Sequence, residues 1–203
     1  VSIGGAVDSF RCRTYDSFSS GVLNPAKWQE HQDPEGQPLM GEHFVDQNLL
    51  HYHVRSIGSQ DQRVVLNLTG YTFQPGDILN YKVNYSDASG NRAIVLFING
   101  GPADRLCRDA GTCLGPSIGF NGGVFAPGND PGTYKITLGF MNDTIEVRIV
   151  RPDFTIFNTT IPVFSWNYAG NVYSSAPPWN IGFETWSNGD IHADYDNFRV
   201  CRR

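Results

Sequence analysis

The sequence predicts an all-β sandwich. Short runs that alternate apolar and polar residues recur along the chain, and no stretch sustains the 3.6-residue spacing of a helix. The 22 Gly and 12 Pro residues divide the chain into short segments separated by turn-forming residues. Because 203 residues suit one β-sandwich with one core, we predict a single domain over residues 1–203.

Each predicted strand is an apolar or alternating run bounded by Gly, Pro, Asn, Asp or Ser. In chain order they are Asp8–Cys12, Trp28–His31, Leu49–Ser56, Gln62–Leu68, Ile78–Ser86, Arg92–Asn99, Ser117–Phe120, Gly132–Met141, Thr144–Arg151, Phe154–Thr160, Trp179–Trp186 and Ala193–Cys201. Met141–Thr144 reads as a tight hairpin turn. Alternation assigns these side chains to the core: Leu66, Leu68, Ile94, Leu96, Ile98, Ile145, Val147, Ile149, Phe198 and Val200.

Charge and motifs exclude several classes of function. The formal net charge is −5 and there is no basic run, so a nucleic-acid partner is not expected. Neither G-x-G-x-x-G nor a P-loop is present. No apolar run reaches the roughly 18 residues of a membrane span.

The two ends of the chain resemble a known family. Residues 181–201 (IGFETWSNGDIHADYDNFRVC) resemble the closing hairpin of concanavalin A-like jelly rolls. Residues 14–28 (TYDSFSSGVLNPAKW) are similar to the entry segment of secreted lectin and glucanase domains of that superfamily. The resemblance implies a jelly-roll sandwich of two antiparallel sheets and a polysaccharide or glycan partner.

The resemblance specifies architecture better than activity. Laminarinase-type glucanases of this fold carry Glu-x-Asp-x-x-Glu on one strand, and this sequence has no such spacing. Glucanase chemistry is therefore disfavoured, and whether the protein is an enzyme stays open.

The chain has four cysteines and no C-x-x-C pair of the kind used by zinc sites. Cys107 and Cys113 would close a short loop, which leaves Cys12 to pair with Cys201. That second pairing agrees with the resemblance, which implies that the first and last strands lie side by side. The alternative is four reduced, buried thiols.

N-x-Ser/Thr sequons occur at Asn67, Asn84, Asn142 and Asn158, and strand alternation puts each on an outward face or in a turn. The sequons and the even number of cysteines together favour a secreted glycoprotein.

Two strands carry candidate ligand-binding residues. On the first, His51, His53 and Arg55 share one face, where they could bind sugar hydroxyls or uronate carboxylates; the alternatives are a solvated face or a metal pair. On the second, Glu184 and Trp186 share a face, with Tyr173 and Trp179 preceding them. Aromatic rings pack on sugar C–H faces while a carboxylate accepts hydrogen bonds from hydroxyls; core packing is the alternative.

A structural Ca²⁺ is a further expectation. The resemblance implies that an Asp of the last strand, here Asp196, meets oxygen ligands near the N-terminal segment, where Asp16 is the candidate. A hairpin cap without metal is the alternative.

Three hypotheses of function follow. The leading one is a secreted carbohydrate-binding domain. The second is a polysaccharide lyase acting on a uronate polymer, with His53, Arg55, Tyr81 and Tyr85 as catalytic candidates. The third is a structural subunit of an extracellular assembly, which self-associates through the apolar arm Val1–Val7.

Overall fold

The fold was analysed in a computed structural model of the chain. It describes residues 11–30, 42–54, 62–86, 92–99, 101–102, 131–163, 165–168, 170–187 and 191–202. Its strands are β1 (Arg11–Asp16), β2 (Trp28–Glu30), β3 (Glu42–Asp46), β4 (Leu49–Val54), β5 (Gln62–Leu68), β6 (Asp77–Ser86), β7 (Arg92–Ile98), β8 (Gly101–Pro102), β9 (Gly132–Phe140), β10 (Thr144–Val150), β11 (Ile156–Pro162), β12 (Ser165–Tyr168), β13 (Asn171–Ser174), β14 (Ile181–Ser187) and β15 (Ile191–Arg202).

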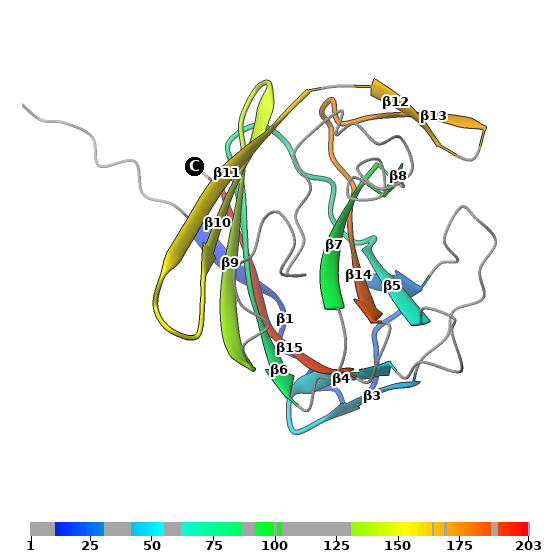
Figure 1. Cartoon of the computed structure of the whole chain (residues 1–203), viewed down its shortest axis with the longest axis vertical. Coiled ribbons are helices and arrows are strands. Elements are labelled where there is room, and N and C mark those ends of the chain that lie inside the picture. Colours follow the sequence, from blue (N-terminus) through cyan, green and yellow to red (C-terminus); the bar gives the residue numbers. More distant parts are fainter. Residues whose placement is uncertain are drawn as a thin grey trace, which may run out of the picture.

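Two antiparallel sheets make the sandwich. The larger has eight strands in the order β11-β10-β9-β6-β15-β4-β3, with β1 paired to β15. The smaller has five, in the order β2-β5-β14-β7-β8, and β12 and β13 form a separate hairpin. The larger sheet curves around β5, β14 and β7, which form the second layer (Figure 1). The predicted all-β jelly roll is confirmed. Within the described ranges, no helix is long and apolar enough to cross a membrane.

The core lies between the two sheets and is rich in aromatic rings. Phe198 of β15 contacts Tyr81 of β6, Phe183 of β14 and Trp28 of β2, with ring centroids 5.0, 5.6 and 4.8 Å away. Each buried ring of this kind contributes about 1.5–3 kcal/mol of transfer free energy. Because Phe183 and Trp28 come from the smaller sheet, this cluster joins the layers.

Alternation predicted the buried face well. Eight of the assigned side chains are buried: Leu66, Leu68, Ile98, Ile145, Val147, Ile149, Phe198 and Val200. The side chains of Ile94 and Leu96 lie outside the described residues. The predicted turn at Met141–Thr144 is confirmed by a hydrogen bond of 2.9 Å from Met141 N to Thr144 O.

Other strand predictions need correction. The described part of the first strand runs over Arg11–Asp16, further along the chain than predicted, because it pairs with the whole end of β15. Strands β3, β8, β12 and β13 were not predicted, since these short segments lack a clear alternation. The predicted strand Ser117–Phe120 and the arm Val1–Val7 lie outside the described residues.

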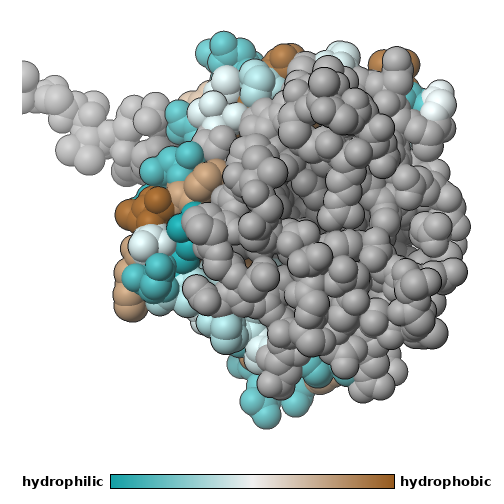
Figure 2. All heavy atoms as spheres, viewed as in Figure 1, coloured by the Kyte–Doolittle hydropathy of each residue, from teal (hydrophilic) through white to brown (hydrophobic). Residues whose placement is uncertain are grey.

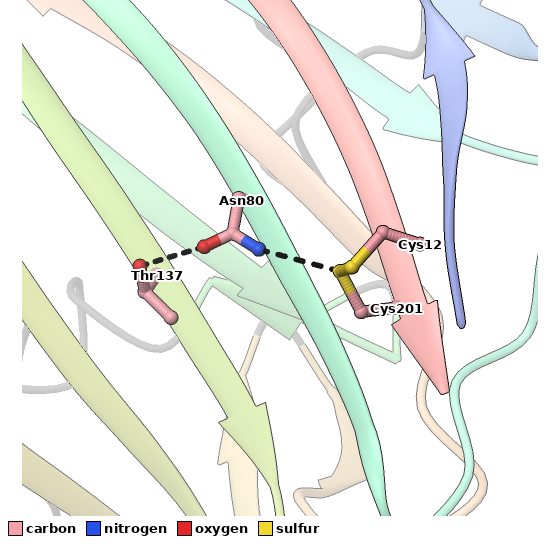
Figure 3. Close-up of a disulfide and its surroundings, with 4 residues drawn as sticks. All are labelled: Cys12, Asn80, Thr137 and Cys201. Carbon is pink, nitrogen blue, oxygen red and sulfur yellow. Dashed lines mark hydrogen bonds between the residues drawn. A yellow bond between two sulfur atoms is a disulfide. The ribbon is translucent and has the colours of Figure 1, made fainter. Parts of the chain in front are cut away.

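The ends of the chain are joined covalently. Cys12 and Cys201 are direct partners in the β1–β15 register and form a disulfide across 189 positions of sequence. In Figure 3, Asn80 of β6 lies beside this disulfide, with Nδ2 3.8 Å from Cys201 Sγ and Oδ1 accepting a hydrogen bond from Thr137. The predicted pairing of Cys12 with Cys201 is confirmed, whereas Cys107 and Cys113 lie outside the described residues.

Candidate functional site

The predicted histidine face lies on the outer side of the eight-stranded sheet. Leu50 and Tyr52 of β4 are buried between the sheets, and the half-buried His51 and His53 alternate with them. The two histidines therefore share a face, as predicted. Arg55 lies outside the described residues.

The side chain of His51 is held by its neighbours. Its Nδ1 lies 2.7 Å from Asp194 Oδ1, and its Nε2 lies 3.2 Å from the carbonyl oxygen of Asp46. Phe44 stacks on the imidazole with centroids 4.6 Å apart and is itself 54% exposed. Each ring nitrogen lies close to an oxygen, so the His51 ring is positioned by its neighbours, and its ligand-binding role stays a prediction.

His53 stacks on His192 of β15, its partner in the strand register, with centroids 3.9 Å apart and an interplanar angle of 17°. Among the described residues, no three His, Cys, Asp or Glu side chains are grouped as a metal site.

The second candidate strand belongs to the other sheet. β14 is the central strand of the five-stranded sheet, and Glu184 pairs with Val65 of β5 and Val95 of β7. Because Phe183 is buried between the sheets, alternation puts positions 184 and 186 on the outer face of that sheet; their side chains lie outside the described residues. Positions 184 and 186 therefore belong to the opposite outer face of the sandwich from His51 and His53, and the ligand-binding roles of Glu184 and Trp186 stay predictions.

Trp179 is a core residue and was wrongly expected at a sugar-binding surface. Its side chain is 0% exposed, its Nε1 donates a hydrogen bond of 2.7 Å to Ser175 O, and its ring contacts Phe140. Tyr173 of β13 is partly buried and packs against the same core. Its ligand-binding role stays a prediction.

The tyrosines proposed for a lyase point into the core. Tyr81 and Tyr85 are 5% and 2% exposed, on the face of β6 that packs between the sheets. Burial, with the nearby Tyr195, raises the pKa of Tyr81 well above its usual value. A catalytic acid or base must reach its substrate, so the assignment of these two residues is wrong. The sequence already indicates this burial. Leu79, Tyr81, Val83 and Tyr85 are every second residue of one strand, so they share the face that packs in the core.

The candidate calcium ligands have other partners. The buried Asp16 accepts hydrogen bonds of 2.9 Å from Phe18 N and 2.8 Å from Trp28 Nε1, one on each carboxylate oxygen. Asp196 accepts a hydrogen bond from Asn197 Nδ2. The burial of Asp16 is thus explained by N–H donors, and a Ca²⁺ site stays a prediction.

The sequons are placed where a glycan could extend outward. Asn142 and Asn158 are exposed, while Asn67 and Asn84 are half-buried and alternate with core residues of β5 and β6. Glycosylation itself stays a prediction.

Sequence reasoning missed a groove on the outer face of the eight-stranded sheet. It has a volume of about 330 Å³ and crosses β15, β6, β9 and β10. We call it the basic groove. Its lining includes four cations and no carboxylate: Lys82, Lys135, Arg148 and Arg199, with the polar side chains of Asn80, Thr137 and Asn197. Alternation within each strand could have put each cation outward, but only strand pairing brings the four together.

Known structures share this fold. A putative β-glucanase from Mycobacterium abscessus has a TM-score of 0.57 at 10% identity, covering 94% of this chain and 98% of that one. A pseudo β-1,3-glucanase and immunostimulatory antigen of Mycobacterium tuberculosis has a TM-score of 0.56 at 12% identity, covering 95% and 98%.

A Bacteroides ovatus GH16 protein, solved with a G4G4G3G product, has a TM-score of 0.53 at 11% identity, covering 91% of this chain and 97% of that one. No known family model matches the sequence, and no curated protein matches it. At these identities the likeness establishes the concanavalin A-like jelly-roll fold.

Proposed function

We propose that this protein is a secreted carbohydrate-recognition domain that binds a polysaccharide or glycan on the outer face of its five-stranded sheet. The observation that carries the proposal is the position of Glu184 and Trp186 on β14, the central strand of that sheet. A central strand is hydrogen-bonded on both sides, so it provides a rigid base for a binding site.

The chemistry of the two residues suits a sugar. An indole packs against the C–H faces of a pyranose ring, and a carboxylate two residues away on the same strand accepts hydrogen bonds from its hydroxyls. The similar structures include a GH16 protein with a bound product and a protein described as a pseudo β-1,3-glucanase. The absence of Glu-x-Asp-x-x-Glu favours binding without laminarinase-type hydrolysis.

Secretion and glycosylation belong to the same proposal. The disulfide between Cys12 and Cys201 supports it, because disulfides persist in oxidising compartments. Mass spectrometry of the protein from its natural source tests for glycans at Asn67, Asn84, Asn142 and Asn158. Unmodified asparagines at all four would contradict that part of the proposal.

Binding is tested with a glycan array and polysaccharide pull-downs, with and without Ca²⁺. Glu184→Gln and Trp186→Ala should each weaken binding about tenfold or more, since each removes a contact made in the site. The matched control is the double variant His51→Gln/His53→Gln on the opposite face, which should bind as the wild type does. No binding to any glycan, or an equal loss in the control, would overturn the proposal.

The same panel tests for catalysis. A binding domain produces neither new reducing ends nor the ultraviolet absorbance of unsaturated uronates. If unsaturated products form and His53→Gln abolishes them, the lyase hypothesis replaces ours. If the protein binds no glycan and sediments as an oligomer that dissociates when Val1–Val7 is removed, the assembly hypothesis replaces ours.

A further inference from the structure

The basic groove concentrates positive charge in an acidic protein. Strand pairing sets two parallel rows across the outer face. One row runs Arg199, Asn80, Thr137 and Arg148, and the next contains Lys82 and Lys135. Neighbouring strands are about 4.8 Å apart and the rows about 7 Å apart, so the four cations lie within reach of one extended ligand. The chain as a whole carries a formal charge of −5, so this local excess of cations runs against the overall composition.

Ion pairing within the described part of the protein does not explain these four charges. Among the residues that the structure describes, none of the four cations has an ion-pair partner, whereas Arg202 is paired with Asp77 and Lys27 with Asp16. Asp196, the nearest acid in the register, faces Lys82 across the strands but is hydrogen-bonded to Asn197.

The second row also contains a repulsive pair. Lys82 has Asp196 as its cross-strand partner on β15 and Lys135 as its partner on β9, and like charges directly opposite one another, such as Lys82 and Lys135, are unfavourable in a sheet. An unfavourable pair that packing does not require is explained when a bound anion neutralises it.

The neutral side chains of the groove define the ligand further. Asn80 and Thr137 are hydrogen-bonded to each other (Figure 3). They lie between Arg199 and Arg148 in the strand register, and Asn197 adds an amide from the bulge of β15. Amides and hydroxyls between cations suit a chain that carries both hydroxyls and anionic groups.

A nucleic acid fits less well, because binding single strands relies on exposed aromatic rings for base stacking. The single aromatic residue that lines the groove, Tyr81, has its side chain buried between the sheets.

A second groove of about 570 Å³ extends the first. It shares Thr137 and Arg148 with the basic groove and continues over β10 and β11 to Asn158 and Thr160, with Glu146 also in its lining. Figure 2 shows hydrophilic residues with a few hydrophobic ones along the edge of the molecule formed by β9, β10 and β11. The two grooves together leave room for several sugar units on this face, with the cations concentrated in the first.

We propose that the basic groove is a second binding site, specific for an acidic polysaccharide that bears sulfate or uronate groups. The proposal rests on the proposed function only in taking the ligand to be a glycan. It uses the opposite face of the sandwich and different residues, so each can fail without the other.

The test is binding of the intact protein to heparin as the sulfated probe, to polygalacturonate as the uronate probe and to dextran as the neutral control. The double variant Lys82→Gln/Lys135→Gln should weaken binding to the acidic probes roughly tenfold and reduce its dependence on salt. The control Arg11→Gln/Arg151→Gln removes the same charge outside the groove and should bind as the wild type does. Binding to polygalacturonate would show that uronate carboxylates suffice, and binding to heparin alone would show that sulfate groups are needed.

The outcomes are distinct. If the wild type binds neither acidic probe, or if both double variants lose affinity equally, the second site is overturned. Loss of neutral-glycan binding in Glu184→Gln with unchanged heparin binding supports both proposals, and heparin binding without any neutral-glycan binding supports the groove alone. Thermal unfolding checks that the variants fold, and removing the Lys82–Lys135 repulsion should not lower the midpoint.

Discussion

At the scale of single residues, two buried carboxylates are held by hydrogen bonds, Asp16 at the end of β1 and Asp77 at the start of β6. Asp16 and Asp77 are buried at 7% and 1% exposure, and both oxygens of each carboxylate accept a hydrogen bond. A buried charge is tolerated only when it is paired or hydrogen-bonded, so these residues should be sensitive to loss of one partner.

Replacing Trp28 tests the hydrogen bonding of the Asp16 carboxylate. Trp28→Phe keeps most of the ring but removes the Nε1 donor 2.8 Å from Asp16 Oδ2, leaving a buried carboxylate oxygen without that partner. We expect the free energy of unfolding to fall by about 2–3 kcal/mol, measured by urea denaturation. Phe154→Leu, at an 81% exposed position, is the control and should change it by less than about 0.5 kcal/mol. Equal stability of Trp28→Phe and the wild type would contradict the interpretation.

Asp77 should make stability depend on pH. Burial alone would raise its pKa, but hydrogen bonds from Arg202, the Gln74 amide and the Tyr71 hydroxyl outweigh it and hold the pKa below the usual 3.8. A lowered folded-state pKa stabilises the fold above the unfolded value, and that contribution is lost as the pH falls through the folded value.

The variant Asp77→Asn should therefore be less stable than the wild type by about 2 kcal/mol at pH 7. The difference should shrink as the pH falls through the lowered pKa of Asp77, because protonation of the wild-type carboxyl removes the contribution of its charge. Urea denaturation over a series of decreasing pH values measures the difference, and a difference that does not change with pH would argue against a charged Asp77.

At the scale of elements, β15 links the core, the disulfide and the basic groove. Its register with β6 shifts between Asp196 and Arg199, and within this bulge Asn197 has a φ of 56°. Before the shift, Asp196 of β15 pairs with Lys82 of β6. After the shift, Arg199 of β15 pairs with Asn80. A bulge redirects the side chains that follow it, so this one determines where Arg199 enters the groove.

Asn197 tests that role. Asn197→Ala should lower the free energy of unfolding by about 1–2 kcal/mol relative to Asn197→Gly, because a residue with a Cβ is strained in the left-handed region. Both variants lose the amide contact to Asp196, so the comparison isolates the backbone. Chemical denaturation measures the difference, and equal stabilities would show that the bulge imposes no such constraint.

At the scale of the whole molecule, one covalent bond closes nearly the entire chain. The variant Cys12→Ala/Cys201→Ala should lose about 5 kcal/mol of unfolding free energy in the loop-entropy description, since the bridged residues are 189 positions apart. Denaturant unfolding of the variant and the oxidised wild type measures this. The predicted Cys107–Cys113 disulfide gives the comparison: Cys107→Ala/Cys113→Ala should cost about 2 kcal/mol, because the loop that this bond is predicted to close is short. A larger loss in the second variant than in the first would contradict this account.

Particular residues explain how far sequence reasoning reached. Leu66, Val147 and Val200 follow a two-residue alternation, which is local and can be read directly from the chain. The same alternation predicts that Tyr81 points into the core, so it also argues against a catalytic role for Tyr81 in a lyase. The burial of Trp179 could not be predicted in this way, because it depends on contact with Phe140 from a distant strand.

The sequence by itself determined the all-β class, the buried face of most strands and, through the resemblance of its two ends, the pairing of Cys12 with Cys201. Only the tertiary structure decided which sheet each strand joins. That choice separates His51 and His53 from positions 184 and 186, and it gathers the four cations of the basic groove. The physical reason is that alternation is a property of one strand, whereas a shared surface requires pairing between strands far apart in the chain.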